Sequence, residues 1–163
     1  MANVTRITCI INTHADAGSG AGTDAAVFLG MGGREFRLDV QGPDFERDAV
    51  GDQYTLGDGA NIRRPQENDP RQPSVLKTTT LDGFPVYFRY APQDSSDHWR
   101  LGGAVVFVYR GDEQLANAYV ADVPAESGIV LGRNAGEILH LRKVSSNERA
   151  ALVEATTNRS VKS

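Results

Sequence analysis

Residues 25–40, AAVFLGMGGREFRLDV, decide the fold class of this chain. The first part of the segment is apolar, Gly32 and Gly33 follow it, and Phe36, Leu38 and Val40 then alternate with other residues, mostly charged. Such alternation puts one face of a strand against a core and the other face in solvent. A pair of glycines between two strands is typical of a tight hairpin turn. The segment therefore predicts a half-buried antiparallel hairpin.

Further strand patterns lie on both sides of this hairpin. They cover residues 4–13, 48–57, 84–90, 103–110, 118–123 and 137–144, and residues 60–63 start another short one. Short strands at fairly regular spacing, separated by glycine and proline turns, indicate a β-sandwich or barrel. We therefore expect an all-β, antiparallel sandwich.

Two segments depart from the strand pattern. Residues 64–74 contain three prolines in a polar stretch, which predicts an exposed loop rather than a domain boundary. Residues 147–155 contain helix formers, and Ser145 or Ser146 is the candidate N-cap. We expect one domain over residues 1–145, followed by a polar tail or short helix over residues 146–163.

Composition limits the classes of partner. The formal net charge is −4 and no basic stripe is present, so nucleic acid is disfavoured. No apolar stretch is long enough to cross a bilayer, so membrane contact would be peripheral. The first residues show no Sec signal, and we expect a cytoplasmic protein, with peripheral membrane attachment or non-Sec export left open. Cys9 lies in an apolar run and is expected to be a small buried hydrophobic residue.

Acidic, glycine-rich loops supply the clearest candidate chemistry. Carboxylates and glycines gather in residues 16–24, 39–44 and 94–97. A sandwich brings loops from distant strands to one end, where carboxylates and glycine carbonyls could surround a hard cation such as Ca²⁺. Aspartate and glycine are also common turn residues, so ordinary turns are the alternative.

Catalytic patterns are weak by comparison. His14, His98 and His140 lie in or beside separate elements, and the sequence holds no HExxH, GxSxG or GxxxxGK[ST] motif. We therefore expect a protein that binds rather than catalyses.

Three motifs in order resemble the PLAT/LH2 family of β-sandwich modules, which occur in lipoxygenases, pancreatic-type lipases, polycystins and clostridial α-toxin. The first is GAGTDAAV at residues 20–27. The second is DFER at 44–47 followed by DQYTL at 52–56. The third is DHWRL at 97–101 followed by VVFV at 105–108. The motifs stand in the order and at spacings compatible with those of the family.

The resemblance extends over residues 4–110 and implies an eight-stranded sandwich of two sheets. In members that bind metal, it also implies Ca²⁺ sites in the loops at one end. Carried over by position, a first site would use the carbonyl of Thr23, the carboxylate of Asp39 and the carbonyls of Val40 and Gly42, with Asp44 adjacent.

A second site would use the carbonyls of Gly22 and His98 and the carboxylate of Asp97. Gly20 stands where some calcium-binding members have an acidic residue, so this site needs Asp16 or Asp94 in compensation. Asp24 is a further candidate ligand, although a bond from its side chain to loop backbone would explain it equally. Trp99, flanked by strand sequence, is expected in the core.

Together these patterns predict a non-catalytic, Ca²⁺-assisted module that docks through its loops onto a lipid or membrane surface or onto a protein partner. The loops carry alanine and glycine rather than large apolar residues, which argues against deep membrane insertion. Two alternatives stay open. One is a structural or self-assembling protein without metal, and the other is a small hydrolase that uses His98 or His14 with a nearby aspartate.

Overall fold

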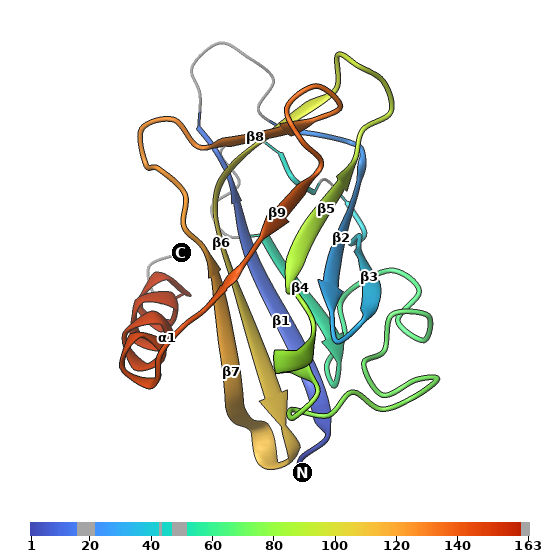
Figure 1. The fold of residues 1–163 in the computed structure, drawn as a ribbon, viewed down its shortest axis with the longest axis vertical. Coiled ribbons are helices and arrows are strands. Elements are labelled where there is room, and N and C mark those ends of the chain that lie inside the picture. Colours follow the sequence, from blue (N-terminus) through green and yellow to red (C-terminus); the bar gives the residue numbers. More distant parts are fainter. Residues whose placement is uncertain (16–21, 43, 47–51, 161–163) are drawn as a thin grey trace.

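Two antiparallel sheets pack face to face in the computed structural model, which describes residues 1–15, 22–42, 44–46 and 52–160 (Figure 1). This architecture confirms the predicted all-β sandwich. The larger sheet has the order β10-β7-β6-β1-β4, with β8 paired to β6, and the smaller has the order β3-β2-β5-β9. The strands of the described residues are β1 (Val4–Thr13), β2 (Ala26–Met31), β3 (Arg34–Leu38), β4 (Asp52–Gly57), β5 (Tyr87–Ala91), β6 (His98–Arg110), β7 (Gln114–Ala121), β8 (Ile129–Gly132), β9 (Ile138–His140) and β10 (Arg142–Lys143).

The hairpin that decides the fold class forms as predicted. Strands β2 and β3 pair antiparallel, with Leu29 opposite Phe36. Gly32 and Gly33 have φ values of 61° and 77°, a left-handed pair that residues with a Cβ adopt only at a cost. Phe36 and Leu38 are buried against the larger sheet, and β3 ends at Leu38.

The expected strand over residues 137–144 is interrupted. Strand β9 pairs with β5 in the smaller sheet, whereas β10 pairs with β7 in the larger one. Leu141, between them, donates its N–H to the carbonyl of Val86. The chain therefore crosses from one sheet to the other inside a single run of strand-like sequence.

Other strand bounds also differ from the predictions: β5 covers residues 87–91 rather than 84–90, and β7 covers residues 114–121 rather than 118–123. Strand β6 begins at His98 rather than at residue 103, because its first residues pair with β8, from His98 opposite Gly132 to Leu101 opposite Ile129. Strand β8 itself was not predicted, since four residues are too few to show a periodic pattern.

The proline-rich loop is mostly exposed, as expected, but Asn68 and Pro70 are buried. The Asn68 side chain accepts a hydrogen bond from the Arg37 N–H at 2.7 Å and donates one to the Arg64 carbonyl at 3.2 Å. Arg71 forms ion pairs with Asp69 and Asp58. The loop thus covers the open edge of β3, which would otherwise expose unpaired backbone groups.

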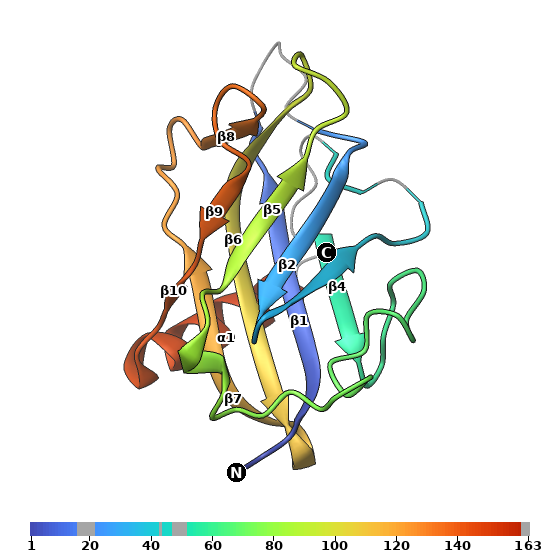
Figure 2. The same cartoon turned by 45° about the vertical axis from the view of Figure 1, so that its right-hand side comes forward.

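Helix α1 (Ser146–Ser160) lies on the outer face of the larger sheet (Figures 1 and 2). The Ser145 N–H donates to the Glu148 carboxylate, and the Glu148 N–H donates to the Ser145 hydroxyl, a reciprocal capping box that starts the helix. Leu152 packs against a second apolar cluster formed by Phe107, Ala118, Val120 and Val144. Among the described residues, no helix is long and apolar enough to cross a membrane.

Candidate functional site

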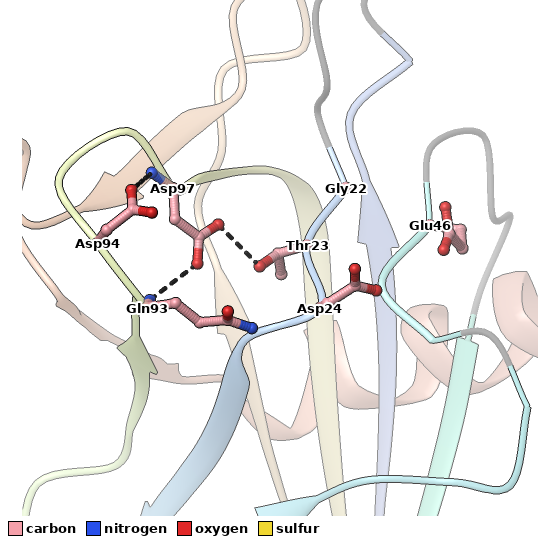
Figure 3. Close-up of a pocket in the computed structure, with 7 residues that line it drawn as sticks. All are labelled: Gly22, Thr23, Asp24, Glu46, Gln93, Asp94 and Asp97. Atoms are coloured by element: carbon pink, nitrogen blue, oxygen red, sulfur yellow. Dashed lines mark hydrogen bonds between the residues drawn. The ribbon is translucent and has the colours of Figure 1, made fainter.

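An acidic pocket of about 390 Å³ opens at the end of the sandwich where β1 leads toward β2 and β5 leads into β6 (Figure 3). Four of its described lining residues carry carboxylates and none is basic. We call it the acidic pocket. Its described lining consists of Gly22, Thr23, Asp24, Glu46, Gln93, Asp94 and Asp97.

Asp97 ties the two sides of this pocket together. Its Oδ1 accepts a hydrogen bond from the Tyr90 hydroxyl at 2.6 Å and one from the Thr23 hydroxyl at 3.3 Å. Its Oδ2 accepts the Gln93 N–H at 3.0 Å. Burial and the bond to Asp97 raise the pKa of Tyr90, so this phenol stays protonated and remains a donor. The arrangement fixes the Asp97 carboxylate at the pocket wall (Figure 3).

Asp94 is held in an aspartate turn on the same side. Its Oδ1 accepts hydrogen bonds from the Ser96 N–H at 2.7 Å and the Ser96 hydroxyl at 2.6 Å, and the Asp97 N–H adds a third at 3.2 Å. The bonds from Ser96 lower the pKa of Asp94. Asp94 is therefore ionised at neutral pH.

Asp24 and Glu46 complete the pocket from the opposite side (Figure 3). Both side chains are exposed. Four like charges around one hollow repel one another, and a divalent cation is the simplest species that would relieve this repulsion. Glu46 and Gln93 were not predicted as site residues. Glu46 stands within the DFER motif, but nothing in that motif indicates that it faces Asp97.

A second, smaller hollow of about 190 Å³ contains the other predicted group, Asp39, Gly42 and Asp44, and Asp24 lines it as well. Arg37 lies 3.6 Å from one Asp39 carboxylate oxygen and Arg63 lies 3.4 Å from the other. Two guanidinium groups thus already neutralise the negative charge of the Asp39 carboxylate, which would otherwise attract a cation. The sequence offered no signal that Arg63 would lie beside Asp39.

Asp44 lies in a different electrostatic setting. One of its carboxylate oxygens accepts the Val40 N–H at 3.4 Å. Burial is the main cause that raises the pKa of Asp44, and the negative charges of Asp39 and Asp52 add to it. Val40 itself forms a bridge with Ile62. The carboxylate is therefore costly to ionise in the folded protein.

The structure places the predicted residues in two groups. Gly22, Thr23, Asp24, Asp94 and Asp97 line the acidic pocket, so Thr23 lies there rather than with Asp39. Asp16 and Gly20 lie outside the described residues.

Ca²⁺ fits the acidic pocket by donor chemistry, because carboxylate and carbonyl oxygens are its usual ligands. Among the described residues, no three His, Cys, Asp or Glu side chains stand in an arrangement that could already hold a metal ion. A cation would therefore require the exposed Asp24 and Glu46 side chains to turn toward Asp97. The Asp39 hollow fits less well, since the cation would have to displace Arg37 and Arg63.

The three histidines lie apart. The His98 side chain is exposed, and its Nδ1 lies 2.8 Å from the Ser96 carbonyl oxygen. His14 Nε2 lies 3.3 Å from the Ala125 carbonyl oxygen, and the His140 ring is 6.1 Å from the Tyr87 ring. Each histidine thus contacts a different part of the fold.

The fold is a two-sheet, antiparallel β-sandwich with one C-terminal helix. The structure is similar to that of the alpha-toxin of Clostridium perfringens isolated from the avian strain SWCP, with a TM-score of 0.52 and 16% sequence identity. The likeness covers 86% of this chain and 32% of the toxin chain, so the chain spans about a third of the toxin's length. Neither a protein-family model nor a curated protein matches the sequence. The shared property is the fold.

Proposed function

We propose that this chain is a non-catalytic binding module that uses the acidic pocket to hold Ca²⁺ and to dock, through that ion, onto an anionic lipid surface. The observation that carries the proposal is the set of four carboxylates around one pocket at the loop end of the sandwich, with no basic side chain among the described lining residues. The similarity of the fold to alpha-toxin, together with the sequence resemblance to PLAT/LH2 modules, supports the same function.

The residues have different parts in this proposal. Asp97 is the fixed ligand, because Tyr90 and the Gln93 N–H position it. Asp24 and Glu46 are the adjustable ligands, and the Gly22 carbonyl is a further oxygen donor. Since Ca²⁺ takes about six to eight oxygens, these groups leave coordination positions for water or for a ligand's phosphate oxygens. The bound ion supplies the positive charge that an acidic protein needs to approach anionic headgroups.

The positions of the exposed apolar side chains favour contact with lipid headgroups over insertion into the bilayer. The exposed large apolar residues among those described are Met1, Val75, Phe84, Ile138 and Val153, and none of them lines the acidic pocket. Docking would therefore depend on the ion and on charge rather than on inserted side chains. A protein partner or a second copy of the chain is the competing occupant, and the experiment separates these outcomes.

The direct test is calorimetric titration with Ca²⁺. We expect saturable binding by the wild type and binding at least about tenfold weaker in an Asp24→Asn/Glu46→Gln variant, which removes two exposed charges and no described hydrogen bond of the fold. Glu126→Gln, an exposed carboxylate outside the pocket, is the matched control. Asp39→Ala should bind as the wild type does.

Sedimentation with vesicles then identifies the surface. Vesicles that contain phosphatidylserine should retain the wild type in Ca²⁺ and release it in EDTA, whereas phosphatidylcholine vesicles should not retain it. Absence of Ca²⁺ binding by the wild type would overturn the metal proposal. Ca²⁺ binding without retention by vesicles would overturn the lipid proposal and favour a protein partner. Ca²⁺-independent self-association would favour the structural alternative.

A further inference from the structure

A third hollow, of about 600 Å³, lies between the outer face of β2 and β3 and residues 63–68, at the start of the proline-rich loop. Its volume falls within the range of about 300–1,000 Å³ that is usual for small-molecule sites. Arg37, Arg63 and Arg64 all line it. We call it the arginine hollow. It shares no described lining residue with the acidic pocket.

The three arginines of this hollow are only loosely paired. The closest N···O distances of their ion pairs are 3.6 Å for Arg37 with Asp39, 3.4 Å for Arg63 with Asp39, and 3.6 Å for Arg64 with Glu67. Charge-assisted hydrogen bonds are shorter, at about 2.7–2.9 Å. Each guanidinium carries five N–H donors, so most of this donor capacity remains available to a ligand.

A neighbouring cluster shows what a tight pair looks like in the same protein. Arg89 donates two hydrogen bonds of 2.8 and 2.7 Å to the Glu35 carboxylate, and the Tyr87 hydroxyl donates a third at 3.0 Å. The bond from Arg89 is the main cause that lowers the pKa of Glu35. Glu35 lines the arginine hollow, but Arg89 already compensates its charge.

The arginine hollow therefore has a local excess of positive charge. With Glu35 neutralised, three arginines face two remaining carboxylates, Asp39 and Glu67. The Arg89 guanidinium also lies 4.2 Å from the centre of the Phe28 ring, which fixes this ring in the wall of the hollow. The hollow thus combines an apolar ring with donors that suit an oxyanion.

Arg64 is held in this position at some cost. Its φ of 51° lies in the left-handed region, which residues with a Cβ adopt only at a cost. The Arg64 carbonyl accepts hydrogen bonds from the Asn68 side chain at 3.2 Å and the Glu67 N–H at 3.1 Å. The buried Asn68 side chain, which also bonds the edge of β3, therefore holds Arg64 at the hollow.

We propose that the arginine hollow binds the phosphate group of a phosphate monoester, with Arg37, Arg63 and Arg64 as donors and Phe28 beside the organic part of the ligand. A phosphate presents oxygens in the geometry that bidentate guanidinium bonds require. It would replace the loose contacts to Asp39 by short ones. The site does not depend on Ca²⁺, so it goes beyond the function proposed above.

Two sources share this chemistry, a soluble phosphate ester and the headgroup of a lipid such as phosphatidic acid. The test uses the full chain, labelled with ¹⁵N, in EDTA at constant ionic strength. Titration with glycerol 3-phosphate should shift the amide resonances around Phe28, Arg37 and residues 63–68 in a saturable manner, whereas glycerol and chloride should not. Sedimentation with phosphatidic acid vesicles, compared with phosphatidylcholine vesicles, separates the lipid source from the soluble one.

The matched variants are Arg63→Gln/Arg64→Gln and, as control, Arg110→Gln, an exposed arginine at the β6–β7 turn. We expect at least about tenfold weaker binding in the double variant and unchanged binding in the control. Thermal unfolding should be similar for all three proteins, because Arg63 and Arg64 are mostly exposed. Non-saturable shifts, equal shifts with chloride, or undiminished binding in the double variant would each overturn the proposal.

Discussion

Thr13 joins three core elements through one hydroxyl group. It accepts a hydrogen bond from the Trp99 indole N–H at 3.0 Å and donates one to the Phe45 carbonyl at 3.2 Å. The Trp99 ring lies 5.2 Å from the Phe45 ring, and Phe45 stacks on Tyr54 at 5.0 Å. Trp99 is fully buried, which confirms the prediction that it belongs to the core. The two hydrogen bonds of Thr13 thus join the start of β6 to the end of β1 and to the Phe45 backbone.

Thr13→Val should destabilise the fold by about 1–3 kcal/mol, because it keeps the shape of the side chain but leaves the buried Trp99 indole N–H without its acceptor. The Phe45 carbonyl keeps its hydrogen bond from the Thr23 N–H. Urea unfolding followed by the fluorescence of Trp99, the single tryptophan, measures this loss. Thr13→Ser keeps the hydroxyl and should cost less. Equal stability of Thr13→Val and the wild type would show that the hydroxyl contributes nothing.

Asp44 gives a prediction about pH. Burial and the charges of Asp39 and Asp52 raise its pKa in the folded state above that in the unfolded chain. Ionisation of this carboxyl therefore costs folding free energy above the folded pKa, and the cost disappears below the unfolded pKa of about 4. Asp44→Asn, which keeps an oxygen for the Val40 N–H, should raise the melting temperature at pH 7 in EDTA.

The gain from Asp44→Asn should shrink as the pH falls through the acidic range, because the wild-type carboxyl then becomes neutral as well. Thermal unfolding of both proteins at pH 7 and near pH 4 provides the comparison. A gain that is independent of pH would assign the effect to packing instead of charge.

At the scale of elements, a loop rather than another strand supplies a hydrogen-bond acceptor at the outer edge of β3. The Arg37 N–H at this edge is bonded to the Asn68 side chain, which belongs to the proline-rich loop. Arg34 also donates to the Asp69 carbonyl at 3.3 Å. The loop therefore protects an edge that could otherwise pair with a second chain.

Asn68→Ala should free that edge and destabilise the fold by about 1–3 kcal/mol, since it removes hydrogen bonds to Arg37 and Arg64. Loss of protection at this edge should appear as faster hydrogen exchange at the Arg37 backbone amide. Gln66→Ala, at an exposed position of the same loop, is the control and should leave that amide protected. Unchanged exchange in Asn68→Ala would mean that the loop does not cover the edge in solution.

At the scale of the whole molecule, the larger sheet has apolar side chains on both faces. One face forms the core between the sheets, and the other carries the cluster of Phe107, Ala118, Val120 and Val144. Helix α1 covers this second face through Leu152, and the Arg142 side chain bonds both Asp122 and Glu148. The helix is therefore part of the folded domain in the structure and not a detached tail.

Leu152→Asp should lower stability by about 1–2 kcal/mol and promote association through the uncovered sheet, because it puts a charge against an apolar cluster. Val153→Asp is the matched control, since the Val153 side chain is 39% exposed. Thermal unfolding and light scattering of the two variants give the comparison. Equal behaviour of the two variants would show that the helix packs loosely or not at all.

The extent to which sequence predicts this molecule varies between its parts. The β2–β3 hairpin, buried Trp99 and the helix start at Ser145 follow from patterns within a few residues of one another. The break between β9 and β10 does not, because the residues of both strands suit a strand equally well in either sheet. The pattern indicates a strand but not its partner.

The sequence by itself determined the class of fold, since alternating apolar residues and glycine turns leave an antiparallel sandwich as the way to bury them. Only the tertiary structure decided which charged side chains the acidic loops bring together. It puts Glu46 in one pocket with Asp97 and places Arg63 beside Asp39. The physical reason is that periodicity is a local property of the chain, whereas the charges that meet in a pocket come from distant segments brought together by the stacking of two sheets.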